Sequence, residues 1–293
     1  MSSAGPVHLA SGKVRELYDA GDDRLLIVST DRISAFDVVM DETIPDKGRA
    51  LTQLSAWWFE QTAGIVPNHF ISVDPSEFPT GTDPDMAGRA MLVRAAEPIR
   101  LECIVRGHLF GSAWAEYEER GTVNGLTMPD GLRQADPLPE PVFTPSTKAE
   151  VGHDEALTPA EAADLVGSGV YGTLERYSLA LFAHGVAHAA TCDLVLADTK
   201  FEFGVIRGDG PEEIVVIDEI LTSDSSRYWE RETYQPGTSP PSFDKQFVRD
   251  FLASQEWDRT PPPPPLPPEV VAGTRQRYVE AYERLTGLPF TTT

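Results

Sequence analysis

The stretch LADTKFEFG (residues 196–204) alternates between apolar and charged residues. Successive side chains of a β-strand point to opposite faces, so Asp198, Lys200 and Glu202 would share one face. Phe201 and Phe203 would then point to the other face. The pattern predicts a strand with two acidic residues and one basic residue on the same face.

A second strand candidate follows this one after the turn sequence RGDGP (207–211), which is a strong hairpin signal. If the hairpin is symmetric about Gly210, Glu202 lies opposite Asp218 on the same face. Two facing carboxylates repel each other unless a cation lies between them, and Lys200 or Mg²⁺ could supply it. The hairpin therefore predicts either a platform for a magnesium nucleotide or the solvated face of an edge hairpin. The position of Asp218, directly after the apolar run 214–217, favours the first.

The composition is that of an ordinary soluble globular protein, with 293 residues, 41% hydrophobic and 24% charged. The sequence shows no run of transmembrane length and no signal peptide, and its two cysteines cannot form a disulfide framework, so we expect a cytoplasmic protein. The net charge of −22 argues against nucleic acid and anionic membranes as partners. Small molecules are the expected partners, and a monomeric protein is compatible with this composition.

Strand and helix patterns predict a mainly antiparallel β part over residues 1–97, followed by a mixed α/β part over residues 98–293. The strand candidates are 14–19, 24–30, 38–44, 91–97, 99–107, 193–206 and 212–220. The helix candidates are 51–62, a short helix ended by Gly121, a long helix from the capping box Thr158–Glu161 to about Ala190, and 268–286. Residues 129–147 read as a long proline-rich connection.

Lysine is unusually scarce in this chain. Of the 24 basic residues only five are lysines, so a lysine marks a position where a compact point charge is preferred to the planar fork of arginine. The lysines are Lys13, Lys47, Lys148, Lys200 and Lys245.

Two further patterns indicate anion binding. Lys13 and Arg15 follow a glycine on the same side of an extended chain, as in a phosphate cradle, although an ordinary first strand is the alternative. Arg106 stands just before a glycine, with Ser112 near a predicted helix start, and an arginine beside a helix N-terminus favours an anion.

Taken together, these motifs resemble those of the SAICAR synthetase (phosphoribosylaminoimidazole-succinocarboxamide synthase) family, in its longer form. The resemblance is collinear over roughly residues 11–252, which makes it far more specific than any single motif. The matching stretches are GKVRELYD, STDRISAFDVV, IPDKGRALTQLSAWWF, ECIVRGHLFGSAW, FTPSTKAEVGHDE, LADTKFEFG, IDEILTSDSSRYW and SFDKQFVRDFL.

The resemblance implies an α+β fold whose antiparallel N-terminal part is similar to the small lobe of protein kinases. ATP would lie in the cleft between the two parts, with adenine near the segment from Arg94 to Ile99. The implied reaction joins the carboxylate of CAIR, a carboxyaminoimidazole ribonucleotide, to the amine of L-aspartate. It gives SAICAR, ADP and phosphate through an acyl phosphate, with Mg²⁺ as cofactor.

The resemblance also implies a role for each candidate residue. ATP would be bound by Lys13, Arg15, Lys148, Lys200, Glu202 and Asp218, of which Lys148, Lys200 and Asp218 would act in catalysis and Glu202 and Asp218 would hold Mg²⁺. The ribonucleotide would be bound by Arg106, Ser112 and Arg227. Asp37 and Lys47 would serve the aspartate or imidazole end, and Glu102 and Asp198 would lie in the site.

Two other functions are open to this sequence. A kinase-like phosphotransferase would share the nucleotide site, but the sequence lacks an HRD-type catalytic loop. A catalytically inert nucleotide-binding module is the other, and the intact acids Glu202 and Asp218 argue against it.

Overall fold

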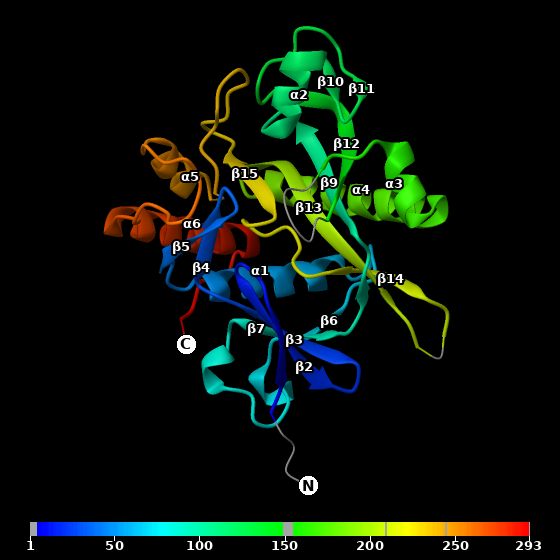
Figure 1. Ribbon diagram of the computed structural model, residues 1–293, viewed down its shortest axis with the longest axis vertical. Coiled ribbons are helices and arrows are strands. Elements are labelled where there is room, and N and C mark those ends of the chain that lie inside the picture. Colours follow the sequence, from blue (N-terminus) through cyan, green and yellow to red (C-terminus); the bar gives the residue numbers. More distant parts are fainter. Residues whose placement is uncertain (1–4, 149–154, 209, 244, 293) are drawn as a thin grey trace.

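Antiparallel sheets dominate the fold, with helices packed between and beside them (Figure 1). The computed structural model describes residues 5–148, 155–208, 210–243 and 245–292. The N-terminal part forms a five-stranded antiparallel sheet in the order β1-β2-β3-β7-β6. Its strands are Val7–Ser11 (β1), Arg15–Gly21 (β2), Arg24–Ser29 (β3), Phe70–Ser72 (β6) and Ala90–Arg94 (β7).

The predicted strand 38–44 does not join this sheet. It appears as β5 (Val38–Thr43), which pairs with β4 (Arg32–Ala35) in a separate two-stranded sheet. The tight turn between them, at Phe36 and Asp37, has positive φ values at both residues.

The second large sheet is built around the strand that contains LADTKFEFG. This strand, β13 (Leu194–Ile206), pairs along its length with four other strands. They are Glu97–Pro98 (β8), Leu101–His108 (β9), Glu213–Ile217 (β14) and Ser226–Glu230 (β15). The outer strand β12 (Pro137–Thr147) pairs with β9.

The strand β12 corrects the prediction of a loop over residues 129–147. Prolines lack the N–H that a strand interior needs, and they are tolerated at edges and bulges. The pairing of β12 with β9 is irregular between Pro137 and Val142, which accommodates the intervening prolines at the outer edge. The sheet thus gains a strand that local sequence disfavours.

The helices follow the predicted pattern, with one break. The capping box at Thr158–Glu161 is confirmed, but Gly167, at φ 87°, divides the expected long helix into two. The helix predicted over 268–286 is confirmed. The helices are Lys47–Thr62 (α1), Ser112–Arg120 (α2), Pro159–Val166 (α3), Ser168–Thr191 (α4), Gln246–Ala253 (α5) and Pro268–Thr286 (α6). Short elements complete the chain: the two-stranded Thr122–Val123 (β10) and Leu126–Thr127 (β11), and the 3₁₀ turns Pro75–Glu77 and Pro84–Met86.

A buried hydrophobic cluster joins the two parts of the chain. Helix α1 packs on β3 and β7 of the first sheet and on α6, while α4 packs on β13 and β9 of the second sheet (Figure 1). The largest buried cluster includes Trp58 of α1, Val93 of β7, and Phe201 and Phe203 of β13. The fold is therefore α+β, as predicted, whereas the division at residue 97 stays a prediction. Within the described residues, no helix has the length and apolarity needed to cross a membrane.

Candidate active site

The alternation in β13 takes the predicted form. Ala197, Thr199, Phe201 and Phe203 are buried, whereas the charged residues between them are only half-buried. The charged face of this strand receives partners from several elements, and each partner is a residue of opposite charge. The candidate site extends along this face.

Two arginines meet at the N-terminal end of this face. Arg227 of β15 donates to Asp198 at 2.7 Å, and Arg106 of β9 lies 3.4 Å from the same carboxylate oxygen. Arg106 also donates to the hydroxyls of Ser112 and Thr144, both at 3.1 Å. Register brings the arginines together, because Asp198 of β13 lies opposite Arg106 on one side and Arg227 on the other.

The surroundings of Arg106 suit an anion. A cavity of about 410 Å³ is lined by Glu102, Arg106, Ser112, Asn124, Thr144 and Ser146, among others. Burial lowers the pKa of Arg106 below its ordinary value; Asp198 opposes this shift and Arg227 adds to it. Two guanidinium groups share a single carboxylate here, so a bound anion would balance the remaining positive charge.

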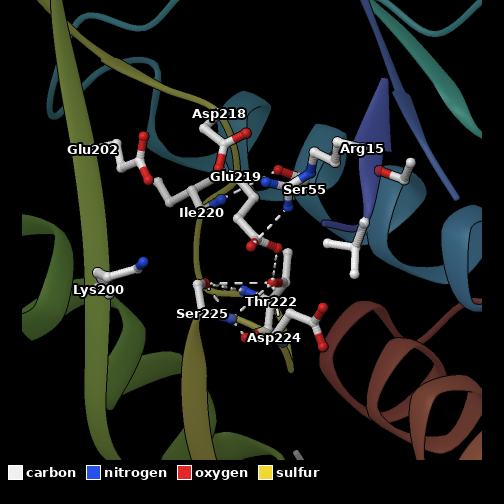
Figure 2. A network of polar contacts seen from close by, with 12 residues as sticks. Arg15, Ser55, Lys200, Glu202, Asp218, Glu219, Ile220, Thr222, Asp224 and Ser225 are labelled. Carbon is white, nitrogen blue, oxygen red and sulfur yellow. Dashed lines mark hydrogen bonds and ion pairs between the residues drawn. The ribbon is translucent and has the colours of Figure 1, made fainter. Parts of the chain in front are cut away.

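Further along the face, both predicted catalytic lysines are paired with glutamates. The ammonium group of Lys200 lies 2.5 Å from Glu102 of β9, and Lys148 contacts Glu202. Burial lowers the pKa of Lys200, but Glu102, Glu202 and Glu219 together outweigh it, so the pKa lies above its ordinary value and the side chain stays charged. Figure 2 shows Lys200 and Glu202 projecting from β13 toward the segment 218–225.

The hairpin register differs from the predicted one by a single residue. Glu202 lies opposite Ile217, so the prediction that it faces Asp218 is wrong. Strand β14 ends at Ile217, and Asp218 has a positive φ of 66°. This conformation is uncommon outside glycine, and it ends the alternation of side chains between the two faces. Asp218 therefore turns away from the ladder, and its Oδ2 lies 2.5 Å from Arg15 of β2.

Sequence reasoning missed a residue next to Asp218. Glu219 also binds Arg15, at 2.7 Å, and its second oxygen accepts a hydrogen bond from Thr222 (Figure 2). Strand alternation would have placed Glu219 on the opposite face from Asp218, and no sequence signal reports the φ value that brings both to Arg15. Burial lowers the pKa of Arg15, but the two carboxylates outweigh it and raise the pKa above its ordinary value.

The glycine-containing turn before β2 is held by side chains from two later segments. Lys13 lies 2.5 Å from Asp37, and both side chains are more than half exposed. Arg32 donates to the backbone carbonyls of Gly12 and Lys13, at 2.9 Å and 3.0 Å. The turn therefore presents Lys13 to solvent on a fixed backbone, while Asp37 approaches it from the turn between β4 and β5.

The resemblance assigns Lys47 to the aspartate or imidazole end of the site, and this assignment stays a prediction. The side chain of Lys47 is fully buried, and its ammonium group lies 3.0 Å from the buried carboxylate of Asp224, which also pairs with Lys245. Burial lowers the pKa of Lys47, although Asp224 opposes the shift. In this structure the Lys47 side chain is therefore held in a buried ion pair with Asp224.

Glu202 and Asp218 offer the oxygen atoms that Mg²⁺ prefers. Among the side chains that the structure describes, no group of three or more His, Cys, Asp or Glu residues could hold a metal ion. Magnesium, however, is commonly held by one or two carboxylates together with substrate phosphates and water. Each of these carboxylates already faces a cationic side chain, Lys148 or Arg15. The residues therefore fit a magnesium ion that is held jointly with phosphates.

Comparisons with known proteins show the family of this chain. A family model described as SAICAR synthetase matches residues 8–264. The phosphoribosylaminoimidazole-succinocarboxamide synthase of Desulfosudis oleivorans is 52% identical over 283 residues, which cover 95% of each chain. That of Geotalea uraniireducens is 49% identical over 282 residues, covering 95% of this chain and 94% of the relative. The solved structure of a SAICAR synthase from Saccharomyces cerevisiae complexed with SAICAR superposes with a TM-score of 0.88 at 40% identity, covering 99% of this chain and 98% of the yeast chain. The chain therefore belongs to the SAICAR synthetase family.

Proposed function

We propose that the protein is an ATP-dependent ligase of purine biosynthesis that joins the carboxylate of CAIR to the amine of L-aspartate. The observation that carries the proposal is the charged face of β13, which has the Arg106 cavity and the Arg106–Asp198–Arg227 cluster at one end and Lys200 and Glu202 at the other. Asp198 and Glu202 are four residues apart, or about 13 Å along a strand. One strand would thus align a ribonucleotide phosphate and the phosphates of ATP. The names of the relatives, and the SAICAR bound to the yeast protein, support this assignment.

The chemistry requires activation of a carboxylate, which is a poor acyl donor. A CAIR carboxylate oxygen would attack the γ-phosphorus of ATP, and breakage of the bond to the β-phosphate oxygen would release ADP. The aspartate amine would then attack the acyl carbon, lose a proton and expel phosphate to leave the amide. Both steps depend on positioning and on neutralisation of phosphoryl charge more than on a protein nucleophile.

The residues of the site meet these needs. Arg106, Ser112 and Arg227 would bind the 5′-phosphate of the ribonucleotide, because arginine forks match phosphate geometry. Lys13, Arg15, Lys148 and Lys200 would bind the phosphates of ATP. Glu202 and Asp218 would hold Mg²⁺, which supplies further charge neutralisation at these phosphates. Asp37, which is exposed beside Lys13, would attract the aspartate amine.

The remaining assignments follow from this proposal. Adenine would lie near the segment from Arg94 to Ile99, which connects the first sheet to the second, in the manner of the hinge beside a kinase small lobe. Glu102 and Asp198 would orient Lys200 and the two arginines through their ion pairs. Small-molecule partners and a cytoplasmic location are consistent with this biosynthetic role.

A coupled assay for ADP release tests the proposal. The purified protein should release ADP only when ATP, Mg²⁺, CAIR and L-aspartate are all present, with SAICAR formed in equal amount. Omission of CAIR or aspartate should reduce the rate to background. Rapid ADP release without aspartate, with phosphate transferred to another acceptor, would support a phosphotransferase instead.

A substitution at Asp218 tests the assignment of the site. Asp218→Asn should abolish turnover, because the amide cannot supply a charged ligand to Mg²⁺. The melting temperature should stay nearly unchanged, since Glu219 still neutralises Arg15. A comparable loss of folding would show that Asp218 is a structural acid.

A further inference from the structure

Asp218 and Glu219 are consecutive in sequence, yet both bind the same guanidinium group. Nη1 of Arg15 lies 2.5 Å from Asp218, and Nη2 lies 2.7 Å from Glu219 (Figure 2). One arginine thus has two carboxylates as counter-ions. The proposed metal site needs only one of them, which raises the question of what the other does.

The two carboxylates are held differently. Glu219 has a second anchor, because its other oxygen accepts from the hydroxyl of Thr222, which is fully buried. The Thr222 oxygen in turn accepts from the backbone N–H groups of Asp224 and Ser225, each at 3.3 Å. In the described part of the chain, the carboxylate of Asp218 contacts Arg15 alone, and its side chain is more exposed, at 25% against 15% for Glu219.

We propose that Glu219 is a positioning residue that keeps Arg15 in place when Asp218 turns from Arg15 to the magnesium ion. The inference rests on the proposed function. Arg15 is largely buried, and a buried cation that loses its only counter-ion is strongly disfavoured. With Glu219 in place, Asp218 is released without leaving Arg15 unpaired, and the freed Nη1 can donate to a phosphate. Without the charge of Glu219, Arg15 and magnesium compete for Asp218.

Nucleotide binding measured by calorimetry tests this division of roles. ADP is titrated into the full-length protein at a series of MgCl₂ concentrations and in the absence of magnesium. Glu219→Gln should raise the MgCl₂ concentration needed for half-maximal enhancement of ADP affinity by about tenfold. Its magnesium-free ADP affinity should be equal to that of the wild type or tighter, because a negative charge near the phosphates has been removed.

A second variant separates positioning from charge. Thr222→Val removes the second anchor of Glu219 without changing any charge, and it should shift the magnesium requirement in the same direction by a smaller factor. Thr222→Ser should restore the wild-type requirement. Thr274→Val removes a buried hydroxyl that donates to Val270 within α6, and it serves as the matched control.

Glu230→Gln is a further control, because it also neutralises a glutamate in a partly buried ion pair. Glu230 lies 2.6 Å from Arg284, and its substitution should leave the magnesium requirement unchanged. A shift in Glu219→Gln but not in Thr222→Val would mean that charge alone acts, and would overturn the positioning role. Equal loss of ADP affinity with and without magnesium would also overturn it. If Glu219→Gln does not fold, the magnesium requirement of Thr222→Val tests the positioning role by itself. Failure of the wild type to bind ADP would instead remove the proposed function.

Discussion

The carboxylate of Asp198 holds two arginines that could bind an anion. One carboxylate orients Arg106 and Arg227, and the three groups together carry a net positive charge. In a chain with a net charge of −22, such a local excess of positive charge is what an anionic substrate requires. Two arginines supply this charge, and the fork geometry of each guanidinium group determines where it lies.

Arg106→Lys tests this point. The guanidinium of Arg106 reaches Thr144, Ser112 and Asp198 through different nitrogen atoms, which a single ammonium group cannot do. Loss of one charged hydrogen bond is worth about 1.5–3 kcal/mol, so the KM for CAIR should rise roughly 10- to 100-fold. The KM for ATP should stay unchanged. Steady-state kinetics check both values, with the exposed Arg120→Lys as the control. An equal rise for both substrates would contradict a phosphate subsite at Arg106.

The stability of the fold should depend on pH because of the buried side chain of His69. Burial lowers its pKa to about 3, and Arg94 and Arg15 add to the shift. Between its ordinary pKa of about 6.5 and the folded value, the unfolded chain binds more protons, so stability should fall as the pH drops through this range. His69→Phe should reduce this slope by up to about 1.4 kcal/mol per pH unit. Urea unfolding from pH 4.5 to 7.5 measures it, and an unchanged slope would mean that His69 titrates alike in both states.

At the scale of elements, α1 is held close to the first sheet by a glycine. A Cβ atom on Gly48 would lie 2.4 Å from the backbone carbonyl oxygen of Ser29, which is the last residue of β3. The backbone N–H of Gly48 is bound by Asp31 at 2.9 Å. The start of α1 thereby fixes the strand end near the turn that carries Lys13, so helix packing and site geometry are linked.

Gly48→Ala should therefore be costly despite the higher helix propensity of alanine. Overpacking typically destabilises by about 1–3 kcal/mol, and here the obstacle is backbone, which cannot rotate away. Gly64→Ala is the matched control, since no atom lies within 4 Å of its added Cβ, and its effect should stay within about 0.5 kcal/mol. Chemical denaturation compares the two. Equal stabilities would show that α1 can shift away from β3.

At the scale of the whole molecule, a buried acid joins distant segments. Asp224 pairs with Lys47 of α1 and with Lys245 just before α5, and it accepts a hydrogen bond from Tyr278 of α6 at 2.6 Å. Burial raises the pKa of Asp224, but the two lysines outweigh it and hold the pKa well below its ordinary value. Helix α6 lies beyond residue 264, where the matched family region ends, yet it supports the loop that carries Glu219 and Thr222.

Lys47 and Lys13 both lie in motifs that match the family, but substitution by methionine should affect them differently. Lys47→Met leaves a buried carboxylate undercompensated and should destabilise the fold by about 3–5 kcal/mol. Lys13→Met removes an exposed pair worth about 0–1 kcal/mol, so it should leave stability almost unchanged while weakening ATP binding. Thermal unfolding and ADP titration of both variants check the contrast. Normal stability in Lys47→Met together with lost substrate binding would support the ligand role that the sequence suggested.

The local sequence is sufficient for features that depend on near neighbours. The alternation in LADTKFEFG determines which side of β13 is charged, the capping box begins α3, and the collinear motifs identify the family. The glycine at position 121 ends α2 with a φ of 68°, as its sequence position indicates. Each of these features rests on side-chain period or on turn chemistry, and both are encoded within a few residues.

Only the tertiary structure decided the features that depend on register and burial. The pairing of β13 with β14 is one residue away from the expected register along the whole ladder, and the positive φ of Asp218, just beyond it, brings Glu219 to Arg15. Lys47 and Lys13 both stand in motifs that match the family, yet packing buries Lys47 and leaves Lys13 exposed. The strand β12 forms from a proline-rich segment because β9 offers it a partner edge. Backbone conformation at a single residue and the environment supplied by distant segments are not local properties, so the sequence pattern could not reveal them.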